Sequence, residues 1–207
     1  MEKLQYISQE TDRTHLQNIR EACEAGVKWV QLRVKNQSTE HVTKMASEAR
    51  EICQSFGATL IINDHPDVAA SSRANGVHLG KKDPSPEEAR KLVGTDRIIG
   101  GTANTFEDLV SLVRMGVDYI GLGPFRFTAT KEKLSPVLGL AGYQSIMDRC
   151  KEAAIQVPVI AIGGIVPEDI PAIMKTGVSG IAIASLINHS TDKRKTVQEL
   201  LNALQDE

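Results

Sequence analysis

Residues 115–123, with the sequence MGVDYIGLG, place a glycine and a valine directly before a short apolar run. The same arrangement recurs in residues 25–32 (AGVKWVQL), 75–80 (NGVHLG) and 176–184 (TGVSGIAIA). Glycine readily adopts the left-handed backbone conformation that ends many helices. Each copy therefore predicts a helix that stops at the glycine and a strand that the valine enters. Four copies indicate a fold built from repeated helix-to-strand units.

Short apolar runs and amphipathic segments alternate along the whole chain. The segments between the runs carry apolar residues at helical spacing, for example Leu16, Ile19 and Cys23. Runs without polar alternation are typical of a parallel sheet covered by helices on both faces. Eight such units predict one α/β domain over residues 1–207, a (β/α)8 TIM barrel with its chemistry at the carboxyl ends of the strands. The predicted strands are residues 3–8, 29–35, 59–64, 76–80, 97–103, 119–125, 158–164 and 180–185.

The composition restricts the partners and the compartment. A formal net charge of -2 leaves no basic surface of the size that nonspecific nucleic-acid binding needs, so no nucleic-acid partner is expected. No apolar run approaches the roughly 18 to 20 residues of a membrane helix, and the N-terminus lacks a signal-peptide core, so no membrane partner is expected. Cys23, Cys53 and Cys150 are odd in number and not at metal-ligand spacing, as in cytoplasmic proteins. We expect a cytoplasmic protein. The sequence does not decide whether it forms a homo-oligomer.

Three polar residues alternate with apolar ones at the end of the second predicted strand. Gln31, Arg33 and Lys35 would share one face, with Leu32 and Val34 on the other. If the polar face points into the barrel, two cations there need an anionic partner, because a buried unpaired charge is costly. A solvated strand end is the alternative.

Two carboxylates follow the third and fourth predicted strands. Asn63 and Asp64 come directly after LII, and Asp83 follows HLGKK. Neighbouring parallel strands could bring Asp64 and Asp83 together, and two carboxylates suit Mg²⁺ bound with substrate phosphates. Taken alone, Asp64 is also typical of an Asx turn and Asp83 of a helix cap. His78 alternates with apolar neighbours and is interpreted as a satisfied barrel histidine.

The remaining strand ends carry small residues. Gly100 and Gly101 open the backbone before Thr102 after the fifth strand, where a turn capped by Asn104 or Thr105 is the alternative. After the seventh and eighth strands, main-chain N–H groups could cradle a phosphate. The residues of that predicted cradle are Gly163, Gly164, Ala184 and Ser185. Two anionic regions predict two phosphorylated small-molecule substrates.

Six motifs in order resemble those of the thiamine-phosphate synthase family, also called thiamine-phosphate pyrophosphorylases. The resemblance covers nearly the whole chain and implies a transferase that uses Mg²⁺. Its substrates would be 4-amino-2-methyl-5-(diphosphooxymethyl)pyrimidine and 4-methyl-5-(2-phosphoethyl)thiazole, or a carboxylated tautomer of the latter, and its products thiamine phosphate and pyrophosphate. The motifs are QLRVK (31–35), IIND (61–64), GVHLGKKD (76–83), GPFRFTATK (123–131), VIAIGGI (159–165) and GIAIAS (180–185).

The resemblance also implies the site residues. Asp64 and Asp83 would hold Mg²⁺. Arg33, Lys35 and Lys131 would be catalytic, stabilising charge on the leaving diphosphate. The residues implied to bind the pyrimidine diphosphate are Gln31, Leu32, Arg33, Val34, Lys35, Asn63 and Thr102. Those implied to bind the thiazole phosphate are Thr128, Ala129, Thr130, Gly164, Ala184 and Ser185. Residues 126–138, which follow no regular periodicity, would form a functional loop.

The sequence departs from the family pattern at three positions. The family often has arginine, histidine and proline where His65, Asn104 and Phe127 stand. These differences bear on the shape of the pyrimidine pocket more than on the reaction. Two alternatives are a related thiazole tautomerase, which lacks the aspartates and relies on a histidine at position 104, and a barrel that binds thiazole phosphate without turnover.

Overall fold

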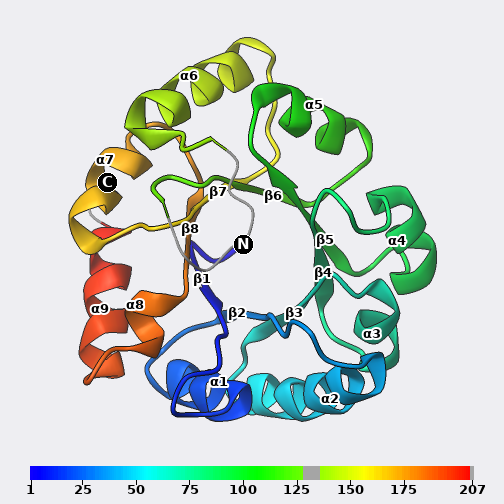
Figure 1. The fold of residues 1–207 in the computed structure, drawn as a ribbon. Helices are drawn as coiled ribbons and strands as arrows, with labels where there is room; N and C mark the ends of the chain where they lie inside the picture. The colour runs from blue at the N-terminus through cyan, green and yellow to red at the C-terminus, as the bar shows by residue number, and fades with distance from the viewer. Residues whose placement is uncertain (128–135, 206–207) are drawn as a thin grey trace.

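Eight parallel strands close into a barrel in chain order, and the helices surround it (Figure 1). The computed structural model describes residues 1–127 and 136–205. The barrel closes where β8 pairs with β1, with Leu4 opposite Ile181. The predicted (β/α)8 fold is confirmed. The strands are β1 (Leu4–Ile7), β2 (Trp29–Leu32), β3 (Thr59–Asn63), β4 (Gly76–Leu79), β5 (Ile98–Ala103), β6 (Tyr119–Leu122), β7 (Val159–Ile162) and β8 (Gly180–Ile183).

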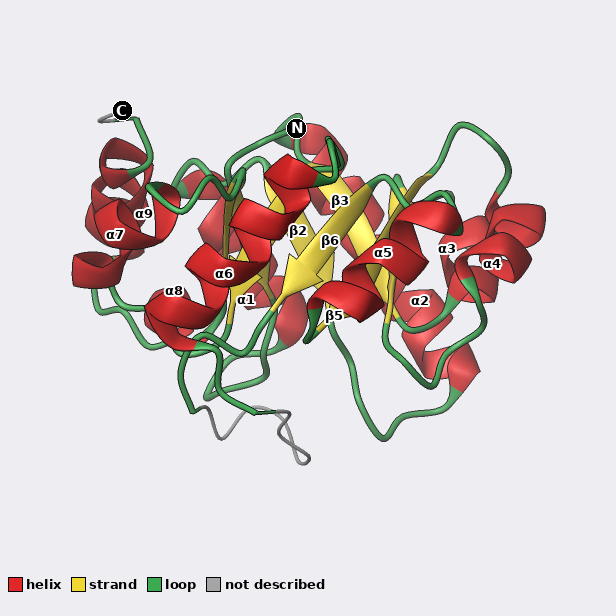
Figure 2. Cartoon of the chain, turned by 90° about the horizontal axis from the view of Figure 1, so that it is seen from above, coloured by secondary structure: helices red, strands yellow, loops and turns green. Residues whose placement is uncertain are grey.

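The helices flank the strands, which lie between them in Figure 2. None of the helices in the described ranges is long and apolar enough to cross a membrane. We call the end of the barrel at the carboxyl ends of the strands the mouth. The helical segments are α1 (His15–Glu24), α2 (Thr39–Ser55), α3 (Pro66–Ser71), α4 (Pro86–Val93), α5 (Phe106–Arg114), α6 (Gly139–Glu152), η1 (Pro167–Asp169), α7 (Ile170–Met174), α8 (Ser185–Asn188) and α9 (Lys193–Ala203).

Side-chain caps begin several helices just beyond the mouth. Ser85 accepts a hydrogen bond from the Glu88 main chain at the start of α4, and Thr105 accepts one from Asp108 at the start of α5. Such caps satisfy main-chain donors that have no partner within the helix. The helix-cap alternative for Asp83 is therefore wrong, because Ser85 fills that position.

The glycine repeat has the predicted backbone in three of its four copies. Gly26, Gly116 and Gly177 have φ values of 112°, 72° and 93°. The prediction was wrong for Gly76, which lies inside β4 without a left-handed φ. A Cβ at that position would overlap the main chain of Ile98 on β5. This glycine is therefore needed for the close approach of two strands, not for a turn.

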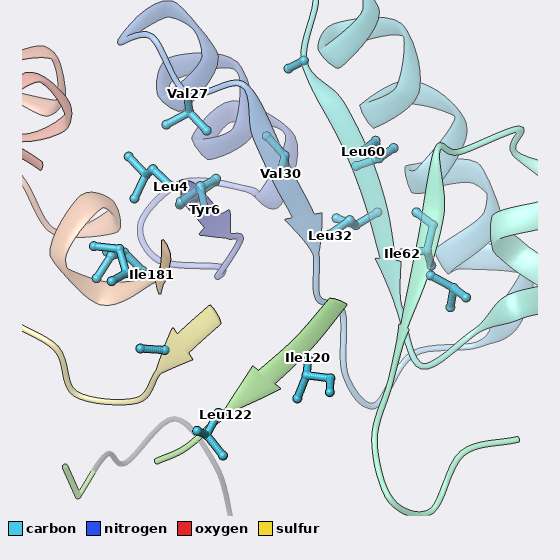
Figure 3. Packing of buried hydrophobic residues seen from close by; sticks show 14 of the residues in the cluster. Leu4, Tyr6, Val27, Val30, Leu32, Leu60, Ile62, Ile120, Leu122 and Ile181 are labelled. Carbon is cyan, nitrogen blue, oxygen red and sulfur yellow. The ribbon is translucent and has the colours of Figure 1, made fainter. Parts of the chain in front are cut away.

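Alternating side chains divide the buried residues between two layers. Residues such as Leu4, Tyr6, Leu32 and Ile62 face the helices and form the larger cluster (Figure 3). Their neighbours along each strand face the inside of the barrel. The smaller, interior cluster consists of Ile7, Trp29, Ile61, Tyr119, Ile160 and Ala182. The three cysteines are buried and unpaired, as small core residues would be.

Candidate active site

A chain of hydrogen bonds crosses the barrel interior between five strands. Gln31 Nε2 donates to Gln5 Oε1 at 3.3 Å, and Gln5 Nε2 donates to the Tyr119 hydroxyl at 3.2 Å. The same hydroxyl lies 3.0 Å from His78 Nδ1, and His78 Nε2 lies 3.0 Å from Thr102 Oγ1. His78 is thus a satisfied barrel histidine, as the sequence suggested. We call these five residues the polar floor.

Tyr119 is the central member of the polar floor. Burial raises the pKa of Tyr119 above its ordinary value, so the hydroxyl keeps its proton. This hydroxyl accepts from Gln5 and lies within hydrogen-bond distance of His78 Nδ1, and the donor and acceptor roles of the two His78 ring nitrogens depend on the tautomer. The contact with His78 holds the Thr102 hydroxyl in the polar floor.

Two glycines make room for the two rings of the polar floor. A Cβ on Gly100 would overlap the Tyr119 ring, and one on Gly121 would lie 3.1 Å from His78 Cε1. Trp29 packs edge-on against Tyr119, with 4.9 Å between ring centroids. The glycines of β5 and β6 thus allow a layer of large side chains to fill the barrel beneath the mouth.

The carboxyl groups of Asp64 and Asp83 lie together at the mouth beside β3 and β4, close enough for each to shift the pKa of the other. Asp64 has a left-handed φ of 68°, and its N–H donates to the His78 carbonyl at 2.8 Å. Asp83 accepts from the Gly80 N–H at 2.6 Å. A left-handed φ outside glycine is uncommon and is often found at functional sites. The structure therefore brings the two predicted metal ligands together.

Charge compensation at this carboxylate pair is uneven. Burial would raise the pKa of Asp64, but its hydrogen bonds with Lys35 and Asp83 lower it overall. Burial, followed by the neighbouring Asp64, raises the pKa of Asp83 to about 6. Lys35 forms an ion pair with Asp64, so the predicted cation has found its anionic partner. Asp83 is the carboxylate whose negative charge is less well compensated.

The carboxylates of Asp64 and Asp83 fit Mg²⁺ better than they fit a metal ion whose ligands are all protein side chains. Within residues 1–127 and 136–205, no group of three or more histidine, cysteine, aspartate or glutamate side chains gathers to hold a metal ion. Mg²⁺ is commonly bound through one or two carboxylates, with waters and substrate phosphates completing its shell. Asp64 and Asp83 meet that requirement only together with an anionic substrate.

Arg33 and Lys35 reach the mouth from the loop after β2 and not from the strand itself. β2 ends at Leu32, so the predicted common face of Gln31, Arg33 and Lys35 does not continue beyond it. Gln31 points into the polar floor, whereas Lys35 contacts Asp64. The Leu32 and Val34 side chains lie in the core, which leaves only their main chain for a ligand.

The loop after β2 is anchored to β1 by a buried serine. The Ser8 N–H donates to the Gln31 carbonyl at 2.9 Å, and its hydroxyl accepts from the Arg33 N–H at 3.1 Å. The same hydroxyl lies 2.9 Å from His15 Nδ1. Burial lowers the pKa of His15, which keeps that ring neutral. Ser8 and His15 therefore hold the backbone that carries Arg33.

Asn63 presents an unpaired donor at the mouth. The residue is only 6% exposed, and its Nδ2 is the one buried side-chain polar atom of the described residues that lacks a hydrogen-bond partner. Leaving a buried donor unpaired costs about 1–3 kcal/mol. An acceptor on a ligand would remove that cost, which supports Asn63 as a binding residue.

The glycine turn after β7 lies beside the end of β8. Gly163 and Gly164 have φ values of 101° and 68°. β7 and β8 are hydrogen-bonded neighbours, with Ile162 opposite Ala182. Beyond β8, Ala184 precedes α8 and the exposed Ser185 is its first residue. The residues of the predicted phosphate cradle thus lie at adjacent strand ends, and we keep that name for Gly163, Gly164, Ala184 and Ser185.

Some functional candidates were missed by sequence reasoning, and others lie outside the described residues. Gln5, Ser8, His15 and Tyr119 were not predicted, although a glutamine inside the apolar run LQYI signals an interior polar group. The predicted residues outside the described ranges are Thr128, Ala129, Thr130 and Lys131, together with most of the predicted loop.

Comparison with known proteins gives one consistent family. The family model for thiamine monophosphate synthase matches residues 4–187. The thiamine-phosphate synthase of Bacteroides thetaiotaomicron is 49% identical over 98% of this chain and 97% of its own length. That of Flavobacterium johnsoniae is also 49% identical, over 96% of this chain and 94% of its own.

A solved structure agrees with the sequence comparisons. Thiamine phosphate pyrophosphorylase from Pyrococcus furiosus is 30% identical and has a TM-score of 0.87. The match covers 99% of this chain and 96% of that one. The chain belongs to the thiamine-phosphate synthase family, whose members are transferases of thiamine biosynthesis.

Proposed function

We propose that this chain joins the aminopyrimidine methyl diphosphate to the thiazole phosphate, giving thiamine phosphate and pyrophosphate. The observation that carries the proposal is the presence of two unlike anion-binding edges on one mouth. Charged and amide side chains gather at β2–β4, whereas main-chain N–H groups and a serine lie at β7–β8. Two phosphorylated substrates bound at these edges would bring their rings together above the polar floor.

The diphosphate substrate is assigned to the β2–β4 edge. Arg33, Lys35 and Asn63 would donate to its phosphate oxygens, which would also satisfy the unpaired Asn63 Nδ2. Asp64 and Asp83 would hold Mg²⁺, which when bound neutralises charge on the diphosphate. The Thr102 hydroxyl, which lies 3.0 Å from His78 Nε2, would contact the pyrimidine ring.

The thiazole phosphate is assigned to the phosphate cradle. Gly164, Ala184 and Ser185 would hold its phosphate, together with Thr128, Ala129 and Thr130. Binding both substrates fixes the thiazole nitrogen against the exocyclic CH₂ of the pyrimidine, which replaces a bimolecular encounter by a positioned one.

The bond changes need no nucleophilic side chain. The C–O bond to the diphosphate breaks with its electron pair leaving on the diphosphate, and the cation that remains is delocalised into the aminopyrimidine ring. The lone pair of the thiazole nitrogen then forms the C–N bond. Arg33, Lys35 and Lys131 act on the charge that grows on the departing diphosphate. With a carboxylated thiazole as acceptor, the same bond-forming step applies, and the ring carboxylate then leaves as CO₂, with the electron pair of its C–C bond returning to the ring and a proton taking its place.

Radiolabelled pyrophosphate release tests this proposal. The expected result is release that requires the pyrimidine diphosphate, the thiazole phosphate and Mg²⁺ together, with each omitted in turn as the control. Binding of the thiazole phosphate without any release would favour the non-catalytic barrel. Isomerisation of a carboxylated thiazole without release would favour the tautomerase, which the Asp64–Asp83 pair and the asparagine at position 104 argue against.

A further inference from the structure

Arg126 joins three segments that are far apart in sequence. It lies just after β6, where the Phe125 N–H donates to the Ile162 carbonyl at 2.9 Å. Its Nη1 donates to the Gly164 carbonyl at 2.6 Å and to Asp169 Oδ2 at 2.9 Å, and its Nη2 donates to Asp169 Oδ1 at 2.9 Å. The planar guanidinium therefore connects the segment after β6, the glycine turn after β7 and η1. β6 and β7 are adjacent strands of the barrel (Figure 1).

Both carbonyls of the glycine turn are held by this one residue. The Arg126 N–H donates to the Gly163 carbonyl at 2.8 Å, and its guanidinium donates to the Gly164 carbonyl. In a trans peptide the C=O and the following N–H point in opposite directions. Fixing these carbonyls therefore directs the N–H groups of Gly164 and Ile165 away from Arg126. Neither N–H donates to a main-chain carbonyl in the part of the chain that the structure describes.

The guanidinium itself is already engaged. Asp169 accepts from both of its terminal nitrogens, and Arg126 Cζ lies 5.2 Å from the centroid of the Phe125 ring. Asp169 in turn accepts from the Val166 N–H at 2.9 Å, which ties η1 to the same turn. An arginine paired in this way offers less to a phosphate than the two main-chain N–H groups that it directs.

We propose that Arg126 is a positioning residue that aims the Gly164 and Ile165 N–H groups at the phosphate of the thiazole substrate. This assignment rests on the proposed function of the phosphate cradle. Arg126 sets affinity for the thiazole phosphate and leaves affinity for the pyrimidine diphosphate at the β2–β4 edge unchanged. Glycines lack side chains that could restrict the turn, so its conformation depends on these external hydrogen bonds.

A second arginine provides a matched control. The Arg149 side chain is 49% exposed, as is that of Arg126, and each forms an ion pair with a shortest distance of 2.9 Å, Arg149 with Glu107. Arg149 also lies over an aromatic ring, that of Phe106, at 3.9 Å. Exposed ion pairs contribute only about 0–1 kcal/mol to stability. The two arginines thus match in exposure and in ion-pair distance, but Asp169 is less exposed than Glu107 and binds both terminal nitrogens of Arg126, and only Arg126 holds the glycine turn in place.

Steady-state kinetics of Arg126→Gln, Asp169→Asn and Arg149→Gln test the proposal. Arg126→Gln should raise KM for the thiazole phosphate about tenfold and change KM for the pyrimidine diphosphate less than about twofold. Asp169→Asn should shift the same KM in the same direction, and the double variant should resemble Arg126→Gln alone, because the two residues act as a unit. Arg126→Lys should restore little of the lost affinity for the thiazole phosphate. The compact lysine ammonium lacks the planar fork with which the guanidinium binds the Asp169 carboxylate and the Gly164 carbonyl together.

The outcomes separate positioning from general stability. A rise in thiazole-phosphate KM with melting temperatures equal to that of Arg149→Gln supports the proposal. Equal changes in both KM values, or a lowered melting temperature with both KM values unchanged, would overturn it. If wild-type protein releases no pyrophosphate, the proposed function fails, and calorimetric binding of the thiazole phosphate decides about Arg126. Weaker binding by Arg126→Gln than by wild type would then still support the positioning role, and equal binding would refute it.

Discussion

The two edges of the mouth differ in the groups that they would offer to an anion. At β2–β4, the groups are charged side chains that compensate one another, as in the ion pair of Lys35 with Asp64. At β7–β8, the proposed binding groups are main-chain N–H groups whose direction depends on Gly163 and Gly164. The first edge should therefore respond to changes of charge and pH, and the second to changes of backbone conformation. Substitutions that alter ligand binding at one edge and leave the other unchanged test this contrast.

The largest expected effect is at the carboxylate pair. Asp83→Asn keeps an acceptor for the Gly80 N–H but removes a ligand charge, so the Mg²⁺ concentration for half-maximal activity should rise by about 100-fold, the upper end of what even outer-shell partners contribute. The melting temperature should not fall, because Asp83 does not cap α4. Activity measured across a Mg²⁺ titration checks this.

Asp96→Asn is the control for Asp83→Asn. Asp96 lies before β5, at the end of the barrel opposite the mouth, and its carboxylate interacts with Thr95. Its Mg²⁺ titration should match that of wild type. If Asp83→Asn lost stability and Mg²⁺ activation in equal measure, the residue would be structural and the charge-based view of this edge would fail.

A smaller effect is expected at the glycine turn. A Cβ at Gly164 would lie 3.0 Å from Arg126 Cβ and 3.1 Å from the Phe127 carbonyl oxygen. Gly164→Ala should therefore displace the turn and raise KM for the thiazole phosphate by about tenfold, with the Mg²⁺ titration unchanged. Initial-rate measurements with each substrate varied in turn distinguish the two edges.

Gly57→Ala separates contact from backbone strain. Gly57 has nearly the same φ, 63°, but a Cβ there meets no atom within 4 Å. Both substitutions place alanine in the left-handed region, which costs roughly 1–2 kcal/mol. Gly57→Ala should lower the melting temperature without altering either KM. An equal KM effect from both variants would show that loss of stability, not geometry of the phosphate cradle, explains the result.

The smallest effect concerns the dependence of stability on pH. The pKa of Asp83 in the folded protein, about 6, is above its ordinary value, so its contribution to stability is present at low pH and is lost as pH rises through about 6. The pKa of Asp64 is lowered, so its contribution is already complete above its ordinary value and does not change in this range. In metal-free buffer, wild type should lose stability relative to Asp83→Asn between pH 5.0 and 7.5.

The size of this difference is limited by solvent. Because Asp83 is partly exposed, the change in the free energy of unfolding should stay below about 1 kcal/mol. Denaturant unfolding of both proteins at the two pH values provides the measurement. A difference of opposite sign, with wild type gaining stability as pH rises, would mean that Lys35 compensates both carboxylates and that the uneven charge distribution described above is wrong.

The sequence predicted the barrel because local patterns carry that information. Apolar runs, helical spacing and turn glycines such as Gly116 depend on residues close together in the chain. Gly76 was misjudged because its reason lies across the sheet, against Ile98. A contact between neighbouring strands depends on their register, which local patterns do not contain.

The same limit applies to the candidate site. Asp64 and Asp83 could be predicted to meet, because charged residues at the ends of adjacent strands are visible in the sequence. Tyr119 looked like an ordinary core residue, since nothing near it in sequence shows that its hydroxyl reaches Gln5 and His78. Arg126 and Asp169 are 43 residues apart, and only the fold shows that they form an ion pair.

The polar floor restricts how the inside of this barrel can change during evolution. Gly100 and Gly121 exclude larger side chains because Tyr119 and His78 occupy the adjoining space. Conversely, losing the Tyr119 ring would remove a hydrogen-bond partner from both Gln5 and His78, and a buried polar atom left unpaired costs about 1–3 kcal/mol. Substitutions that enlarge one of these glycines and substitutions that remove a ring are therefore both destabilising when made singly. The interior can be remodelled only by paired substitutions.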